Sequence, residues 1–168
     1  MIKRAAKQLQ RSGCDIIKVL FTIDVDYITF KDVSTIESGS ILSICLERGG
    51  KISATANKEF SYQYNHGPKT FLVKEKVSIM ATMYQDRKTG RFQEKSGKLM
   101  LRKLKKSRFG GDAYFGLGYT VLQLDSIATD AAVVSATDIA GAKEYSISLV
   151  GLPGSTMSAT ISARYGTL

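Results

Sequence analysis

The sequence contains one histidine and two cysteines, and this scarcity limits the chemistry that the chain can perform. His66 is the only imidazole, so a metal site built from several histidines is excluded, and its neighbours Asn65 and Gly67 are typical of a surface turn. Cys14 and Cys45 do not have the spacing of a metal site, so we expect reduced thiols, with a disulfide between them as the alternative. We therefore predict no catalytic residues, no metal site, no cofactor and no enzymatic activity.

The sequence also lacks any long apolar run. No stretch approaches the ~18 to 20 apolar residues of a membrane-spanning helix. The beginning of the chain has no apolar core of a secretory signal, and Ile2 stands where N-myristoylation requires glycine. We therefore expect a cytoplasmic protein whose membrane contact, if any, is peripheral. Residues 1–14 form a predicted basic N-terminal arm, with a weak organellar transit peptide as the alternative, because they contain no acid and four basic residues: Lys3, Arg4, Lys7 and Arg11.

Short groups of β-forming residues, separated by Gly, Ser, Asn and Asp, dominate the rest of the chain. A chain of 168 residues with 43% hydrophobic content can bury one sizeable core, so we expect one domain over residues 15–168. The pair Gly49-Gly50 predicts a tight hairpin turn. The pattern predicts an all-β antiparallel sandwich with strands at residues 15–30, 41–46, 51–56, 71–84, 98–104, 115–124, 144–150 and 157–165.

Some of these segments leave alternatives open. Residues 71–84 fit one strand or two short ones. Residues 98–104 favour a strand, although their alternating apolar and basic residues also fit a short amphipathic helix. Residues 57–70 are expected to be a long loop, and the Ala-rich residues 126–142 a connection with room for a short helix.

Basic charge is the most prominent feature that is present. The net charge is +9, and the segment from Lys88 to Arg108 holds nine Lys and Arg residues against one acid, Glu94. Such a block creates a positive potential whose natural partners are polyanions: lipid headgroups, nucleic acid or an acidic protein surface. Nucleic acid is the least expected of these because no RNP-like or helix-turn-helix pattern accompanies the charge.

Several short motifs around this block resemble the N-terminal C2 (NT-C2) domain of the early estrogen-induced gene, EH-domain-binding and plastid-movement-impaired proteins. The motifs are Gly110-Gly111-Asp112-Ala113-Tyr114, Leu117-Gly118-Tyr119, Leu101-Arg102-Lys103, the Gly49-Gly50 hairpin and Thr89-Gly90. The resemblance covers about residues 15 to 165. It implies an eight-stranded C2-type sandwich that docks onto lipid or protein, commonly as the first domain of a longer scaffold. The chain departs from the pattern at Gly116, where many relatives have Lys.

The resemblance also raises the question of calcium binding, because many C2 domains bind this ion through clustered Asp residues. Here Lys103 and Lys105 stand about where calcium-binding relatives place an Asp-x-Asp pair. The nearby carboxylates are only Asp112, Asp32 and Glu37. Calcium requires six to eight oxygen ligands, several of them charged, so we predict a calcium-independent member.

These observations together predict a surface that docks a larger scaffold protein onto anionic, phosphoinositide-containing cytoplasmic membrane. A protein-interaction module in trafficking or signalling is the alternative function, and solubility alone would also explain exposed basic residues. In this hypothesis Phe109 is an apolar wedge. The aromatic residues at 60, 62 and 64 fit either the core or a loop tip at the same end. The predicted lipid-binding residues are Arg102, Lys103, Lys105, Lys106, Arg108, Phe109 and Lys58.

Overall fold

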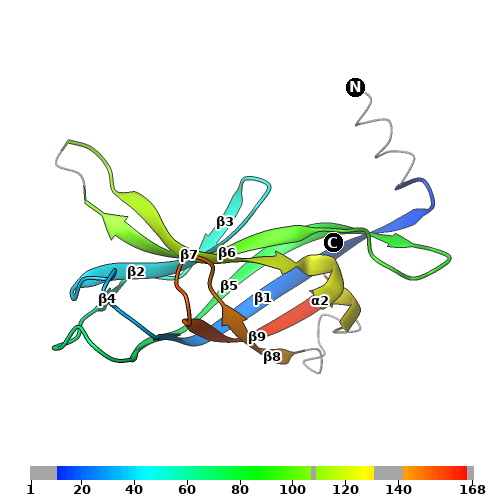
Figure 1. Cartoon of the computed structure of the whole chain (residues 1–168). Coiled ribbons are helices and arrows are strands. Elements are labelled where there is room, and N and C mark those ends of the chain that lie inside the picture. Colours follow the sequence, from blue (N-terminus) through cyan, green and yellow to red (C-terminus); the bar gives the residue numbers. More distant parts are fainter. Residues whose placement is uncertain (1–10, 107–108, 131–141, 166–168) are drawn as a thin grey trace.

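Two antiparallel sheets account for most of the computed structural model, which describes residues 11–106, 109–130 and 142–165 (Figure 1). The strands are β1 (Cys14–Phe30), β2 (Ser40–Arg48), β3 (Lys51–Ala54), β4 (Lys58–Phe60), β5 (Lys69–Asp86), β6 (Ser96–Lys105), β7 (Ala113–Gln123), β8 (Lys143–Ser148) and β9 (Thr156–Tyr165). A short helix, α2 (Leu124–Asp130), follows β7.

The strands are arranged in two layers. Sheet A has the order β5-β1-β9-β8, and sheet B has the order β3-β2-β6-β7, with β4 paired to β2. All of these neighbours are antiparallel. The chain moves from sheet A to sheet B after β1, returns for β5, crosses again for β6 and β7, and ends in sheet A, which is the topology of a sandwich.

The core between the sheets follows from the alternation of side chains along each strand. Phe21 and Ile23 of β1 are fully buried, whereas Thr22 between them is half-buried. Leu42 and Ile44 of β2 are fully buried and belong to the same core. Each side chain of this kind stabilises the fold by roughly 1.5 to 3 kcal/mol when it is removed from water. The alternation therefore decides which face of each strand is left for binding.

The structure confirms the predicted all-β sandwich and resolves the open alternatives. Residues 98–104 lie within β6, which pairs with β2 on one side and β7 on the other, so the helical alternative is wrong. Residues 71–84 belong to one strand, β5. The strand predicted over 51–56 ends at Ala54.

Two connections differ from the prediction. Residues 57–70 contain the short strand β4, which raises the expected eight strands to nine among the described residues. Phe60 explains β4, because its buried ring packs against Phe30 (5.2 Å) and Phe71 (5.6 Å) and holds this segment against β2. Helix α2 begins at Leu124, earlier than expected. Residues 131–141 and the first ten residues of the N-terminal arm lie outside the described residues.

Candidate functional site

The β6–β7 hairpin carries the C-terminal part of the basic block to one end of the molecule. Figure 1 shows the end of β6 and the beginning of β7 projecting from the body of the sandwich. The last register pair before the tip is Lys105 with Ala113. Both strands are therefore aligned up to the tip, which places the following Lys106 beyond the paired region.

The two faces of this hairpin are different. Leu99 and Leu101 of β6 are fully buried toward the core, so Lys98, Met100 and Arg102 lie on the outer face of sheet B. The register shifts after Leu101, because it pairs with Gly118 while Arg102 pairs with Gly116, and Leu117 is the extra residue. Lys103 then falls on the same side as the buried Leu42, its register partner on β2.

Gly116 has a packing reason that the sequence did not show. A Cβ at this position would lie 2.8 Å from Met100 Sδ, so a larger residue would displace that thioether. A Lys at 116 would also stand directly opposite Arg102. Met100 and Arg102 of β6 thus explain why a glycine fits at this position of β7.

Each of three cations along the hairpin lies over an aromatic ring of β7. Lys98 Nζ is 4.6 Å from the centroid of Tyr119, Arg102 Cζ is 3.6 Å from that of Tyr114, and Lys105 Nζ is 4.7 Å from that of Phe115. These distances are typical of cation–π contacts, which stabilise exposed pairs by about 0.5 to 1 kcal/mol. Neither Tyr119 nor Phe115 is among the site residues predicted from the sequence, although both lie in the strand predicted to follow the basic block.

Arg102 is held by further hydrogen bonds on this face. Its Nε donates to Ser43 Oγ at 2.9 Å. Asn57 Nδ2 donates to the Tyr114 hydroxyl at 3.0 Å, so the ring beneath Arg102 is also fixed. Arg102 is accordingly half-buried and oriented along the sheet, and it does not lie at the tip.

The structure separates the seven predicted lipid-binding residues into groups. Lys105 and Lys106 are exposed at the end of β6, and Phe109 has 98% of its surface exposed. Lys103 is half-buried. Arg108 lies outside the described residues.

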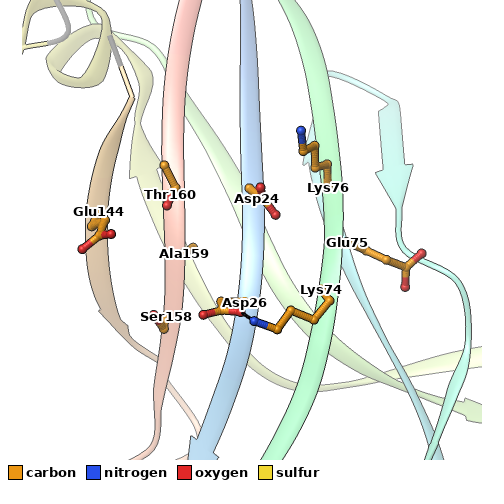
Figure 2. Close-up of a pocket in the computed structure, with 9 residues that line it drawn as sticks. All are labelled: Asp24, Asp26, Lys74, Glu75, Lys76, Glu144, Ser158, Ala159 and Thr160. Carbon is orange, nitrogen blue, oxygen red and sulfur yellow. Dashed lines mark ion pairs between the residues drawn. The ribbon is translucent and has the colours of Figure 1, made fainter. Parts of the chain in front are cut away.

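Lys58 occupies a different environment from the tip. Its Nζ lies 3.2 Å from Glu75 Oε2 and also donates to the backbone carbonyl of Val73. Figure 2 shows Glu75 extending away from its neighbours on β5, which is consistent with this pairing. The charge of Lys58 is therefore locally compensated, and it adds less to a surface potential than Lys105 or Lys106 does.

The aromatic residues of the connection before β5 divide between core and surface. Phe60 is buried, and the hydroxyl of Tyr62 donates to the backbone carbonyl of Ile36. Tyr64 is 65% exposed, with its ring 5.8 Å from that of His66. The first two rings are structural, and only Tyr64 is available to a partner.

The carboxylates expected near the tip do not gather. Asp32 accepts hydrogen bonds from the backbone N–H and the hydroxyl of Ser34, at 2.9 and 3.1 Å. Asp112 and Glu37 are exposed. Across residues 11–106, 109–130 and 142–165, no three His, Cys, Asp or Glu side chains are grouped so that they could hold a metal ion.

Neither the cysteines nor the helices suggest another kind of site. Cys14 and Cys45 are both buried, with no disulfide between them, and burial raises the pKa of the Cys45 thiol. Within the part of the chain that the structure describes, no helix has the length and apolar character needed to cross a bilayer.

A depression of about 450 Å³ lies on the outer face of sheet A. Figure 2 shows Lys74 and Asp26 pointing toward each other from β5 and β1, where they form an ion pair. Lys74 has a φ of 52°, and the register of the two strands shifts beside it. Two lysines and four carboxylates line the depression: Lys74, Lys76, Asp24, Asp26, Glu75 and Glu144. This excess of negative charge makes the depression, which is one part of the outer face of sheet A, unsuitable for a polyanion.

No protein-family model matches the chain, and no curated protein matches it. Solved structures do. The chain is similar to a structure of extended synaptotagmin 2 that holds its SMP domain and two C2 domains, with a TM-score of 0.51 and 12% identity over 98% of this chain and 31% of that one. It is also similar to CC2D1B, whose structure is described as that of a coordinator of ESCRT-III activity in the mitotic reformation of the nuclear envelope, with a TM-score of 0.50 and 8% identity over 96% and 68%.

A third structure, a single C2 domain of plant extended synaptotagmin 1, has a TM-score of 0.46 and 12% identity over 89% of this chain and 95% of that one, a similarity too low to bear on the fold. The chain spans about a third of the extended synaptotagmin 2 chain. With the two-sheet topology, the first of these likenesses identifies the fold as a C2-type antiparallel β-sandwich.

Proposed function

We propose that this C2-type sandwich docks a larger scaffold protein onto anionic cytoplasmic membrane, without calcium and without catalysing a reaction. The observation that carries the proposal is the end of the β6–β7 hairpin, where exposed Lys105 and Lys106 stand close in sequence to a Phe109 that is 98% exposed. The proposed binding partner is phosphoinositide-containing membrane, because its headgroups concentrate negative charge. The acidic depression on sheet A supports the same orientation, with the hairpin toward the lipid.

Electrostatic attraction is the larger part of the proposed affinity. Each basic residue near an anionic leaflet contributes on the order of 1 kcal/mol, and this contribution falls off within a Debye length. Lys105 and Lys106 are exposed and join no ion pair among the described residues, whereas Lys58 is paired with Glu75. We assign the main attraction to Lys105 and Lys106, with Arg102, Lys103 and Arg108 as further members and Phe109 as the inserted side chain.

Salt should therefore weaken membrane binding steeply. We expect the chain to co-sediment with vesicles that contain phosphatidylserine and phosphatidylinositol bisphosphate, and to be released as the Debye length shrinks from about 10 Å at 0.1 M salt to about 3 Å at 1 M. Neutral phosphatidylcholine vesicles are the control. Equal binding to neutral vesicles, insensitive to salt, would show that Phe109 insertion dominates and that the proposed order of contributions is wrong.

Calcium should leave both stability and binding unchanged. Among the described residues, Asp32, Glu37 and Asp112 belong to no group of side chains that could hold a metal ion. Lys103 and Lys105 stand about where the resemblance places the Asp-x-Asp pair of calcium-binding relatives, and their ammonium groups would repel the ion. Melting and vesicle co-sedimentation at millimolar calcium should match the same measurements in chelator. A saturable calcium isotherm that Asp112→Asn abolishes would overturn calcium independence.

The outer face of sheet B favours the alternative, a protein-interaction module. Tyr114, Tyr119 and Val121 are exposed along β7 beside the cations of β6, and Tyr and Arg are enriched in protein interfaces. A substitution on this face distinguishes the membrane-docking function from the protein-interaction function. Tyr119→Ser should leave vesicle binding unchanged under the membrane hypothesis, since Tyr119 lies away from the hairpin tip, whereas a protein partner using this face would be lost.

A further inference from the structure

A second group of cations lies at the end of the sandwich opposite the hairpin tip. We call it the Lys95 cluster, and its members are Arg11, Lys18, Arg48, Lys51 and Lys95. Lys95 immediately precedes β6, whose ten residues end at Lys105. At about 3.3 Å per residue, the cluster is roughly 30 Å from the tip. The two surfaces are therefore separate.

Lys95 is fixed between two strand residues of sheet A. Its Nζ donates to the backbone carbonyl of Thr82 and lies 5.5 Å from the centroid of Tyr84. Lys18 Nζ donates to the hydroxyl of the same Thr82, at 2.5 Å. Arg11 Cζ lies over the same Tyr84 ring, 4.1 Å from its centroid. The three cations thus contact the same two residues of β5, Thr82 and Tyr84.

The β2–β3 hairpin adds two more cations. Arg48 Nη1 donates to the backbone carbonyl of Ser96 at 2.7 Å, directly next to Lys95. Lys51 is the register partner of Arg48 across the Gly49-Gly50 turn. Four separate parts of the chain therefore bring positive charge to one place.

Two carboxylates of this end, Asp15 and Asp86, are engaged with residues outside the cluster. Asp15 pairs with Arg87 (Oδ1 to Nε, 2.8 Å), and Asp86 accepts the backbone N–H groups of Lys88 and Thr89. Asp125 accepts the backbone N–H of Lys95, and Glu47 and Glu94 adjoin Arg48 and Lys95 in sequence. Among the described residues, no member of the cluster takes part in an ion pair.

Burial and the neighbouring positive charges both act on the central residue of the cluster, Lys95. Burial lowers the pKa of Lys95 to about 8, and the charges of Arg48, Arg11, Lys18 and Lys51 contribute to this lowering in that order. Like charges held this close repel one another, and a bound anion would relieve the repulsion.

We propose that the Lys95 cluster is a binding site for an anion with clustered phosphate groups, distinct from the membrane-docking tip. A single phosphate would neutralise one or two of five cations. Several phosphates on one compact scaffold, as in a polyphosphorylated inositol, would pair with them together. Exposed Lys18 and Lys51 are compact point charges for phosphate oxygens, and Arg11 offers a planar guanidinium.

Calorimetry with inositol hexakisphosphate tests this site without any membrane, so its result is independent of the proposed docking function. We expect saturable binding with one ligand per chain. Replacing both exposed lysines, Lys18→Gln with Lys51→Gln, should weaken the affinity about tenfold or more, because two charge-assisted contacts are lost. Both residues are exposed, so the fold should persist, which a melting curve checks.

The matched control is Lys105→Gln with Lys106→Gln, which removes the same charge at the other end. This variant should bind inositol hexakisphosphate within about twofold of the unmodified chain. Equal weakening by both double variants would mean that only net charge matters, and it would overturn the site. Absence of saturable binding by the unmodified chain would overturn it as well.

Vesicles then identify the source of the phosphate groups. Phosphatidylinositol bisphosphate vesicles are compared with phosphatidylserine vesicles of equal charge. If the Lys18→Gln, Lys51→Gln variant loses binding only to the phosphatidylinositol bisphosphate vesicles, the ligand of the site is a lipid headgroup. If its binding to both kinds of vesicle is unchanged, the ligand is a free soluble anion. Both results support the site once calorimetry has shown it.

Discussion

Reversing the charge of Lys105 and Lys106 is expected to reduce binding to anionic vesicles by about a thousandfold. Lys105→Glu with Lys106→Glu removes two attractive charges and adds two repulsive ones, each worth on the order of 1 kcal/mol beside an anionic leaflet. A total of about 4 kcal/mol corresponds to nearly three orders of magnitude in affinity. Vesicle co-sedimentation at low salt measures the loss directly.

Stability should hardly change in that variant. Both lysines are exposed, and substitutions at such positions usually alter the free energy of unfolding by no more than about 0.5 kcal/mol. The matched control is Lys76→Glu with Lys143→Glu, an equal charge change on exposed residues of sheet A, which should keep most of the binding. If the hairpin variant still bound fully while Lys3→Glu with Arg4→Glu did not, the docking site would be the N-terminal arm.

Replacing Gly118 should damage the fold itself. A Cβ at this buried position of β7 would lie 3.0 Å from Leu152 Cδ1 and 3.3 Å from Leu149 Cβ. Those residues belong to the segment that closes the edge of β7, where Tyr119 and Val150 exchange two backbone hydrogen bonds of 3.0 and 2.7 Å. Overpacking of this kind costs about 1 to 3 kcal/mol, so Gly118→Val should lower the melting temperature by several degrees.

Gly97→Ala provides the comparison for Gly118→Val. Gly97 is also buried, but its added Cβ would meet its neighbours at 3.6 to 3.7 Å, which is ordinary contact. We expect it to melt close to the unmodified chain and to bind vesicles normally, whereas Gly118→Val should lose binding only where it unfolds. Equal melting of both variants would show that the β7 edge segment adapts without cost.

Local patterns in the sequence were sufficient for most of the strands. Alternation in residues 15–30 and the Gly49-Gly50 turn concern neighbours in the chain, and their physical cause acts over a few residues. The short β4 was missed because its stability comes from Phe60 packing on Phe30 and Phe71, which are distant in sequence.

The candidate site was predictable in composition but not in arrangement. The sequence located the basic block and Phe109. It did not reveal that Arg102 lies along the outer face of sheet B or that Lys103 lies on the core side, since this depends on how β6 pairs with β2 and β7.

The sequence by itself determined the all-β class, the number of basic residues and the block in which nine of the 24 occur. Only the tertiary structure decided which charges remain uncompensated, because that depends on contacts between remote segments. Glu75 forms an ion pair with Lys58, which lies 17 positions earlier in the chain. Lys18 and Lys95 both donate a hydrogen bond to Thr82, although one precedes it in the chain and the other follows it. Coulomb interactions depend on distance in space and on burial, neither of which is written in the order of residues.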